Sequence, residues 1–478
     1  MTAISTAATA LSERPDVSTT AAPFDPRRVR ATPIGPARLL RGLDDASGFD
    51  NASGFDDVPG FDDGSGLDWD THRRSHGDRP SPGNAELLRL LSAAGLTGRG
   101  GAGFPLADKI SALRRGRPVV VVNGAEGEPG SAKDAVLLAR VPHLVLDGAA
   151  VVADAIGARR AIVAVTDPIV ERLVRGAVGQ RPDAARFEVR RVPARFIAGE
   201  GRTLVRVLSG GPQLPPGRRV HATEHGVDGA PTLLANAETF AHVGLLARTG
   251  PPAPVAGPGS EVSDAWAETG TTLLSVTGAV ARPGVVEVPI GLRLGELAAH
   301  VGAHPSPFVV IGGYHGAWLD ADPALVLSRP ALRAAGGTLG AGTVMFVGAD
   351  TCAPAELGRV ADWLAGESAR QCGPCAFGLP SLAAQLRATP LDGRARPPAT
   401  STWRQLGQLP GRGACAHPDG SARFLASGLA RIEADLSHHR THNHSRGGPS
   451  VPEVSREHVD RGDLATDRTA AFTPRARS

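Results

Sequence analysis

The residues best suited to chemistry in this sequence of 478 residues lie in two glycine-rich stretches, 98–104 (GRGGAGF) and 123–130 (NGAEGEPG). Glycines at this density let a backbone approach a flat or phosphorylated ligand closely and direct its N–H groups at it. Lys109 and Lys133 follow the two stretches, and they are the only lysines among 51 lysine and arginine residues. A compact, flexible ammonium at these places favours a ligand site, and arginine-rich codon usage is the alternative explanation.

Gly98, Gly100 and Gly103 also match the G-x-G-x-x-G fingerprint of dinucleotide-binding domains. That fingerprint requires a strand before the loop and a helix that opens on it. Here the preceding residues 85–94 have the apolar spacing of a helix, and the nearest β-branched run, 119–122, follows the loop. The sequence therefore predicts a glycine loop of another kind.

Four cysteines form a second candidate site, since all of them lie between Cys352 and Cys415. Two belong to a C-x-x-C motif, Cys372-Gly-Pro-Cys375. The N-terminus shows neither the charged nor the apolar region of a secretory signal, so we expect a cytoplasmic location. Cysteines crowded into one segment of a cytoplasmic chain favour a metal site over disulfide bonds.

The composition excludes several classes of function. A net charge of +3 and an aromatic content of 4% provide neither the basic field nor the stacking rings of a nucleic-acid-binding protein. No apolar run approaches the ~18 residues of a membrane-spanning helix, so we expect no direct membrane insertion. The length suits about two to four domains, because single cores rarely grow beyond ~250–300 residues.

Strands and helices alternate between residue 86 and about residue 248, which indicates an α/β layer with a largely parallel sheet. The predicted strands are 119–122, 161–165 and 187–192, and the predicted helices are 85–94, 142–155 and 168–178. After a Pro/Gly-rich linker at 251–265, residues 270–348 read as short strands around a helix at 294–300, and residues 353–436 have helical spacing.

Taken whole, the sequence resembles the flavoprotein subunit of respiratory NADH dehydrogenase and its relatives in NAD-linked formate dehydrogenases and hydrogenases. The resemblance rests on GRGGAGFP followed by Lys109, and on N-x-x-EGEPG followed by Lys133 and Asp134. It implies an NADH dehydrogenase-type oxidoreductase with FMN, NAD(H) and a [4Fe–4S] cluster. Hydride would pass from NADH or NADPH to FMN, and single electrons would pass on to the cluster.

The resemblance also implies a domain layout. The expected regions are a mostly disordered one with Gly-Phe-Asp repeats (1–85), an α/β Rossmann-like flavin domain (86–250), a small β-grasp (SLBB-like) domain (266–350), a helical iron–sulfur-binding bundle (353–438) and a disordered tail (439–478). Calcium binding by the repeats is the alternative to disorder, but their register matches neither an EF-hand nor the nonapeptide calcium repeat. A short segment at 36–43 is expected to pack on the body.

The resemblance assigns the chemistry to Glu126, Glu128 and Lys109. It assigns contacts with FMN and the nucleotide to a larger set: Gly98, Arg99, Gly100, Gly101, Gly103, Phe104, Lys109, Asn123, Glu126, Glu128, Phe196, Gly199, Glu200, Asn236 and Thr239. Asn236 and Thr239, at the start of a predicted helix, are expected to hold a phosphate, because amides at helix N-termini favour anions.

Four positions depart from the family's motifs. Ala125, Phe196, Gly201 and Ala235 stand where the family has an Asp, a Tyr, a Glu and an Asn. The lost polar groups are expected to change how tightly flavin or nucleotide binds, or which nucleotide is accepted.

The cysteine motif departs as well. The family ligates its cluster with E-S-C-x-x-C-x-P-C and a later fourth cysteine, and Ala369 replaces the first of these cysteines. The alternatives for the fourth ligand are a histidine such as His417 or a water on one iron. A further alternative is that the cluster is lost or contains three irons. We expect the metal ligands to be Cys352, Cys372, Cys375 and Cys415.

A one-electron donor implies an acceptor. We expect a [2Fe–2S] subunit, a ferredoxin or a membrane reductase as partner, with NADH as substrate. The missing cysteine and the altered flavin contacts indicate a stand-alone or divergent relative. The alternatives are a reductase that serves a ferredoxin or another small acceptor, and a non-catalytic scaffold of the same fold that has lost its cofactors. A degenerate scaffold is not expected to keep both lysines and the EGEPG loop.

Overall fold

The computed structural model describes residues 25–41, 43, 67–217, 220–251, 270–387 and 400–439. The Gly-Phe-Asp repeats, most of the linker and the tail beyond residue 439 lie outside the described residues. No described helix is by itself long and apolar enough to cross a membrane. Helices α4 (Lys133–Arg140) and α5 (Pro142–Ile156) meet that test only as a pair, with a bend of 94° between them.

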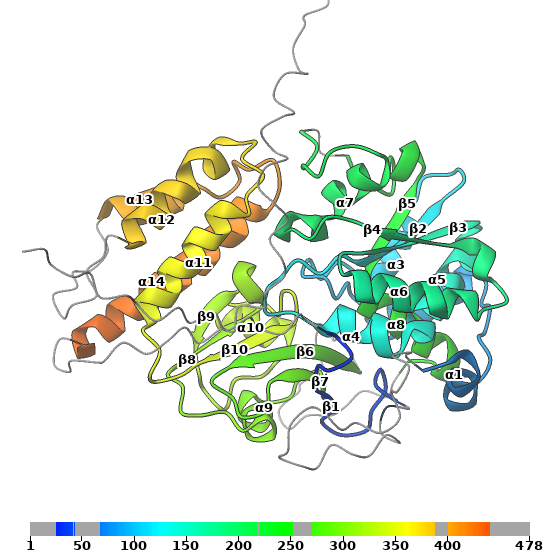
Figure 1. Cartoon of the computed structure of the whole chain (residues 1–478), viewed down its shortest axis with the longest axis horizontal. Coiled ribbons are helices and arrows are strands. Elements are labelled where there is room, and N and C mark those ends of the chain that lie inside the picture. The colour runs from blue at the N-terminus through cyan, green and yellow to red at the C-terminus, as the bar shows by residue number, and fades with distance from the viewer. Residues whose placement is uncertain are drawn as a thin grey trace, which may run out of the picture. The chain divides into compact units, whose positions relative to one another are not determined.

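The first sheet consists of parallel strands in the order β4-β3-β2-β5 (Figure 1). The strands are β2 (Val119–Gly124), β3 (Arg160–Val165), β4 (Phe187–Arg191) and β5 (Thr232–Asn236). The apolar runs of β2 and β3 are buried on both faces, as expected for central strands of a parallel sheet. The predicted strands are confirmed, and β5 is a strand that the sequence pattern does not reveal.

Helices cover this sheet. Helices α5, α6 (Pro168–Gly179) and α8 (Ala237–Thr249) contact the sheet, and α5 also contacts both α6 and α8. Leu204 of α7 (Gly201–Leu208) packs with Val119 and Val121, whose side chains share one face of β2. The predicted helices are confirmed to within about two residues, including α2 (Asn84–Ala93) before the first glycine stretch, which leads into α3 (Leu106–Ser111).

The second sheet is mixed, in the order β1-β7-β6-β10-β8-β9. Its strands are β1 (Ala31–Pro33), β6 (Thr271–Gly278), β7 (Gly284–Pro289), β8 (Phe308–Ile311), β9 (Ala317–Asp320) and β10 (Thr343–Val347). β10 pairs parallel with β6 and antiparallel with β8. Helix α9 (Leu294–Val301), as predicted, packs its leucines into one core of the sheet, and α10 (Arg329–Ala334) adds Leu332 to that core.

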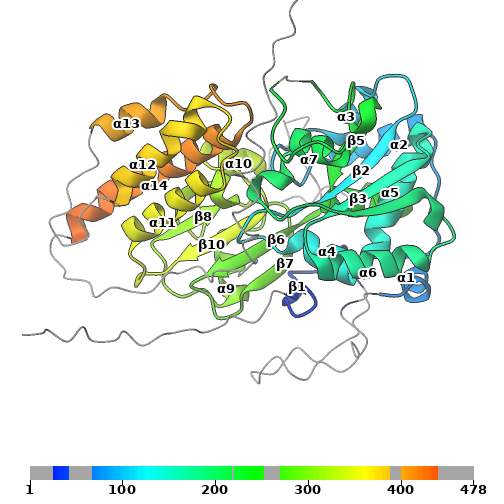
Figure 2. The ribbon, with the colours of Figure 1, turned by 45° about the horizontal axis from the view of Figure 1, so that its top comes forward.

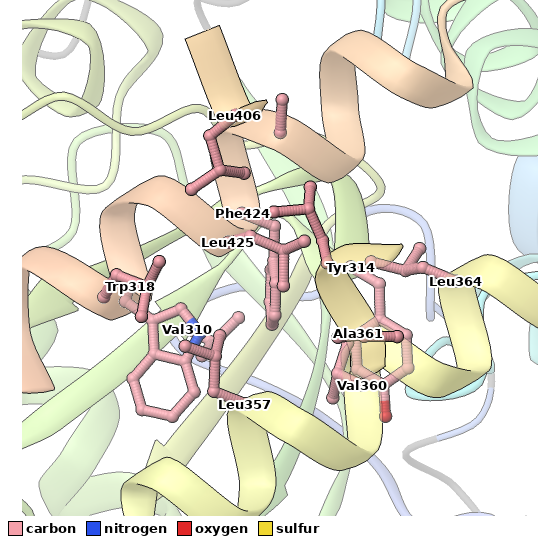
Figure 3. Close-up of a cluster of buried hydrophobic side chains, with 14 of the residues drawn as sticks. Val310, Tyr314, Trp318, Leu357, Val360, Ala361, Leu364, Leu406, Phe424 and Leu425 are labelled. Carbon is pink, nitrogen blue, oxygen red and sulfur yellow. The ribbon is translucent and has the colours of Figure 1, made fainter. Parts of the chain in front are cut away.

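The C-terminal helices pack on another core of the same sheet. They are α11 (Ala353–Gly366), α12 (Leu379–Arg387), α13 (Thr400–Gly407) and α14 (His417–His439). Figure 2 shows α11, α12 and α14 side by side. Figure 3 shows Val310 and Trp318 of the sheet facing Leu357 of α11 and Phe424 of α14. Tyr314 belongs to this cluster and is 4% exposed, so its ring serves packing.

The N-terminal region contributes two elements that the sequence pattern does not predict. β1 pairs with β7, and α1 (Trp69–His76) packs against α5. Leu39 and Leu40 lie between these two elements in the sequence, and their backbone N–H groups donate to Glu287 of β7 at 2.9 and 3.1 Å. Both leucines are buried, so the prediction that segment 36–43 packs on the body is confirmed.

Candidate functional site

The carboxyl ends of β2 and β5 mark the point where the first sheet reverses its strand order. From β2 the chain moves to β3 and β4 on one side, and it returns to β5 on the other side of β2. Asn123 near the end of β2 and Asn236 at the end of β5 are direct partners in the parallel register. Ligands of open α/β sheets bind in the crevice outside such a switch point. The two predicted asparagines therefore lie where the fold itself favours a ligand.

The glycine loop 98–104 lies against the end of β5 and the start of α8. The Arg99 amide donates to Thr239 Oγ1 at 2.9 Å. A Cβ on Gly100 would stand 3.3 Å from the Cβ of Asn236, so the loop backbone approaches the strand end closely. The structure thus brings the loop, Asn236 and Thr239 together, as the sequence predicts.

Arg329 of α10 covers part of this loop, and the sequence analysis missed it. Its guanidinium donates to the Gly98 carbonyl at 3.0 Å, and a Cβ on Gly103 would stand 2.5 Å from it. Gly103 also has a φ of 61°, a left-handed backbone that glycine adopts without strain. Phe104, the next residue, is 53% exposed. The loop therefore ends in an accessible aromatic ring beside a glycine that no other residue can replace without strain.

Asn236 and Thr239 are engaged with protein groups. Asn236 Oδ1 accepts the Glu238 amide at 3.0 Å and the Lys133 ammonium at 3.3 Å, while its Nδ2 donates to the Asp134 carboxylate. The Thr239 hydroxyl accepts the amide of the glycine loop. Both side chains hold the first turn of α8 and the loop in place, and their contact with a phosphate stays a prediction.

The second glycine stretch lies beside η2 (Phe196–Gly199), a short 3₁₀ helix. Asn123 Nδ2 donates to the Gly199 carbonyl at 3.1 Å, and its Oδ1 accepts the Ala125 amide at 3.1 Å. A Cβ on Gly127 would stand 2.8 Å from the Cα of Phe196. Segments far apart in the chain, the stretch 123–130 and η2, are therefore brought to the same edge of the sheet.

The predicted carboxylates all accept backbone amides from the first turns of helices. Glu200 accepts an amide of the first turn of α7 at 2.7 Å, and Glu126 accepts the Ala135 amide of α4 at 3.1 Å. Glu128 accepts the amide of Tyr314, in the 3₁₀ helix η4 (Gly313–His315), at 3.0 Å. Helix N-termini present unsatisfied amides that carboxylates stabilise. These contacts position the loops, and the catalytic roles of Glu126 and Glu128 stay predictions.

The two lysines have different surroundings. Lys109 Nζ donates to the Leu234 carbonyl of β5 at 2.6 Å, and no ion pair of Lys109 occurs among the residues described. Burial lowers the pKa of Lys109. Lys133 is 2% exposed, and its ammonium lies 3.0 Å from both the Asp134 and the Glu238 carboxylates. An ammonium has three donors, so Lys109 retains donors for an anion, whereas Lys133 is neutralised inside the protein.

The carboxylates around Lys133 share a single buried ammonium. Burial raises the pKa of Asp134 to about 6; Lys133 opposes this rise, and the charges of Glu126 and Glu238 add to it. Burial also acts to raise the pKa of Glu238, but the Lys133 charge, a hydrogen bond with His242 and the Arg99 charge together outweigh burial and lower that pKa below its usual value. Of the two carboxylates that pair with Lys133, Asp134 therefore takes up a proton before Glu238 does.

Three of the predicted metal ligands are neighbours. Cys372 and Cys375 stand at the start of η5 (Pro374–Gly378), a π-helical turn that continues into α12, and Cys415 lies just before α14. The Cys375 thiol is hydrogen-bonded to the Cys372 thiol, and its other neighbours include Cys415 and the Ser368 hydroxyl. Burial is the main cause that raises the pKa of Cys375, and Cys372 is the second. Burial also raises the pKa of Cys415.

Cys352 is the fourth predicted ligand, and this prediction is wrong. Cys352 precedes α11, whose 14 residues extend about 21 Å at a rise of ~1.5 Å per residue. Ser368, which contacts the Cys375 thiol, follows the opposite end of the same helix. About the length of α11 therefore separates Cys352 from Cys375, too far for a shared cluster.

Phe196 connects the two candidate sites. Its ring centroid lies 4.9 Å from that of Trp363 on α11 and 5.7 Å from that of His417, two residues after Cys415. Its amide donates to Glu367 at 3.1 Å, one residue before Ser368. The predicted flavin contact η2 therefore adjoins the cysteine site directly.

Comparison with known proteins is consistent with this arrangement. Residues 91–245 match the family model of the Nuo51 FMN-binding domain, 273–305 an SLBB domain, and 355–439 the NADH-ubiquinone oxidoreductase-F iron-sulfur binding region. NADH-quinone oxidoreductase-F of Mycobacterium bovis is 31% identical over 320 residues, which cover 61% of this chain and 71% of that relative. The chain belongs to the NADH-quinone oxidoreductase-F family.

Another member and one solved structure agree with this assignment. NADH-quinone oxidoreductase-F 2 of Rhizobium meliloti is 29% identical over 74% of this chain and 88% of its own length. A chain of an NAD+-reducing [NiFe]-hydrogenase in the air-oxidised state superimposes with a TM-score of 0.65 at 26% identity. The match covers 74% of this chain, which spans only 63% of the hydrogenase chain.

Membership of the oxidoreductase-F family confirms the class of function predicted from the sequence. The chain is an NADH-oxidising electron-transfer flavoprotein of the NADH dehydrogenase type, with regions for FMN and an iron–sulfur cluster and an SLBB domain between them. The described residues fit FMN. Loop 98–104 has a glycine backbone that a planar ring can approach closely, and Lys109 supplies a cation with free donors near the switch point.

The fit to a [4Fe–4S] cluster is incomplete. Among the residues described, no three His, Cys, Asp or Glu side chains converge on a single metal ion. Cluster ligands hold different irons and lie farther apart than the ligands of one ion, so the three neighbouring cysteines still suit a cluster. They supply three thiolates where the family's motif has four.

Proposed function

We propose that this chain binds FMN at the β2–β5 switch point, oxidises NADH there and passes electrons through an iron–sulfur centre to a partner protein. The observation that carries the proposal is the convergence of loop 98–104, Asn123, η2 and Lys109 at one edge of the sheet. Bound FMN supplies the capacity to take a hydride and release its electrons one at a time.

The proposed role of each residue follows from its position. The glycine backbone of 98–104 gives a planar ring close access, because Gly100 leaves no side chain between loop and strand end. Lys109 uses one donor on the Leu234 carbonyl and directs the remaining donors to the flavin phosphate. Glu126 and Glu128 keep the second stretch in shape and face the nucleotide from there.

The electrons leave toward the cysteine site. Phe196 and the segment around Glu367 place the flavin loops against that site. The named relatives are a subunit of NADH-quinone oxidoreductase and a chain of an NAD+-reducing hydrogenase. By analogy, we infer a protein acceptor in the cytoplasm, such as a [2Fe–2S] subunit, a ferredoxin or a membrane reductase.

The test is NADH oxidation by the full chain after reconstitution with FMN, under anaerobic conditions, with ferricyanide as artificial acceptor. We expect turnover that depends on FMN and stays low with riboflavin, which lacks the phosphate that Lys109 would hold. NADH and NADPH are compared in the same assay. A protein that remains colourless after reconstitution and shows no turnover would instead support the scaffold alternative.

A further inference from the structure

The cysteine site has no thiolate for one of the four irons of a [4Fe–4S] cluster. Ala369 stands three residues before Cys372, at the place of the first cysteine in the family's motif. The length of α11 excludes Cys352. With Cys372, Cys375 and Cys415 already assigned, the four cysteines of the chain provide no further candidate.

The neighbouring side chains are committed to other contacts. His417 is 3% exposed, its Nδ1 lies 3.0 Å from His315 Nε2, and its Nε2 lies 2.9 Å from the Leu364 carbonyl. The Ser368 hydroxyl donates to the Ala365 carbonyl at 3.0 Å. Neither His417 nor Ser368 reaches an iron without losing the contacts that hold it.

The position of the missing cysteine, Ala369, lies beside solvent-exposed residues. Ala369 is half-buried, and Arg370 and Gln371 are exposed, whereas Cys375 and Cys415 are 2% and 6% exposed. Arg370 has a φ of 52°, an uncommon left-handed conformation for a residue other than glycine. The chain therefore turns through solvent between Ala369 and Cys372, while the other two cysteines lie in the protein interior.

We propose that Cys372, Cys375 and Cys415 hold the cluster with three thiolates, and that the iron nearest Ala369 carries an exchangeable water-derived ligand. The inference rests on the iron–sulfur centre of the proposed function. That iron is bound to the protein only through cluster sulfides, so it leaves first. Conversion of [4Fe–4S]²⁺ to [3Fe–4S]⁺ releases one Fe²⁺ and one electron, which ferricyanide accepts, and the four sulfides remain.

The experiment uses the full chain purified anaerobically. Iron, acid-labile sulfide and EPR spectra are measured before and after stoichiometric ferricyanide. We expect about four irons per chain before treatment and about three after it, with about four sulfides throughout and the EPR signal of a three-iron cluster. Ala369→Cys completes the set of four thiolates, so this variant retains its fourth iron. Cys352→Ser is the matched control and behaves as the wild type, because Cys352 lies at the far end of α11.

Two results would overturn the inference. Wild-type protein that resists ferricyanide as Ala369→Cys does must have a fourth protein ligand, and loss of that resistance in Ser368→Ala would identify it. Wild-type protein without iron and sulfide would show that three thiolates hold no cluster. FMN content and NADH-dependent bleaching, measured on the same sample, test the flavin function separately. The wild-type titration decides the outcome by itself if Ala369→Cys does not fold.

Discussion

Lys109 and Lys133 differ in what surrounds their ammonium groups, and this difference separates ligand binding from stability. Lys109 has a backbone carbonyl as partner and retains donors for an anion. Lys133 is enclosed with the carboxylates of Asp134 and Glu238. We therefore expect the same residue type to serve two purposes within one loop system, so that substitution of each lysine gives a distinct result.

Substitution of Lys109→Met should weaken FMN binding without unfolding the protein. Loss of a charge-assisted contact with the phosphate corresponds to roughly 10–100-fold in Kd, from about 1.5–3 kcal/mol. Flavin fluorescence quenching measures the affinity, and Arg115→Met, which removes an exposed cation nearby, is the control. Riboflavin affinity should be unchanged in both variants. Equal FMN affinity in wild type and Lys109→Met would place the phosphate elsewhere.

Substitution of Lys133→Met should destabilise the fold. It leaves the Asp134 and Glu238 carboxylates buried without their ammonium, and loss of one partner of a buried ion pair costs about 3–5 kcal/mol. Urea unfolding measures the change, with Lys109→Met as the comparison that loses much less. If the two lysine variants unfold at the same urea concentration, the buried network does not stabilise this protein as its geometry indicates.

The sequence identifies both lysines because lysine is rare in this chain, but it cannot distinguish their surroundings. Glu238, which neutralises Lys133, lies more than a hundred residues farther along the chain. Arg329, which covers the glycine loop, comes from another sheet region altogether. Cys352 shows the same limit, since its clustering with the other cysteines in the sequence says nothing of the helix between them.

At the scale of elements, the close approach of α5 and α8 depends on glycine. A Cβ on Gly148 of α5 would stand 1.7 Å from the Phe240 carbonyl oxygen of α8, and a Cβ on Gly244 would stand 2.7 Å from the Leu144 carbonyl oxygen. Backbone atoms cannot yield as a flexible side chain does. The position of α8, whose N-cap is Asn236, therefore depends on this helix contact.

Substitution of Gly148→Ala should destabilise the protein by roughly 3 kcal/mol, the upper part of the usual range for overpacking. The matched control is Gly176→Ala on α6, where no atom lies within 4 Å of the added Cβ. That control should be neutral or slightly stabilising, because alanine is the better helix former. Thermal unfolding of both variants measures the difference, and similar melting temperatures would contradict the close contact.

The docking of α1 should depend on pH. His143 of α5 is fully buried, its ring meets that of Trp69 of α1 edge to face and lies tilted against that of His72, and its Nε2 lies 3.0 Å from Gln180 Oε1. Burial lowers the pKa of His143 to about 4, and the pKa of His76 on α1 to about 4 as well. The unfolded state thus binds more protons between pH 4 and 6.5, and the stability present above pH 6.5 is lost as the pH falls.

His143→Gln should reduce this dependence. From pH 7 to pH 5, neutral His143 accounts for about 2 kcal/mol of lost stability, and the variant lacks that titration. Urea unfolding at the two pH values gives the comparison between wild type and variant. An equal loss in both would show that His143 does not govern the pH response, and His76 would be examined next.

Elements with strong patterns could be predicted, and elements that depend on distant partners could not. The valine run of β2, the apolar helix α5 and the amphipathic helix α6 match their predicted ranges closely. Helix α1 is rich in polar residues and owes its place to the 2.8 Å contact between His72 and the buried Asp147. β1 has three residues, too few for a pattern, and forms because β7 offers an edge.

At the scale of the whole molecule, the flavin region and the second sheet are joined through the site itself. Glu238 of α8 accepts the Leu273 amide at 2.9 Å, and Glu128 accepts the Tyr314 amide at 3.0 Å. Arg99 in the glycine loop reaches the Thr271 carbonyl. The SLBB region therefore helps to hold the two glycine stretches in place. Sequence patterns within each region do not reveal such contacts between them.

The central claim is that the loops gathered at the β2–β5 switch point hold FMN in a form that NADH reduces. Its most direct test is the visible spectrum of the FMN-reconstituted chain during anaerobic titration with NADH. We predict that the oxidised flavin bands disappear. The end point should lie near one NADH per flavin, plus the additional NADH whose electrons reduce the cluster. Flavin that binds but keeps its oxidised spectrum in excess NADH, or no bound flavin at all, would contradict the claim.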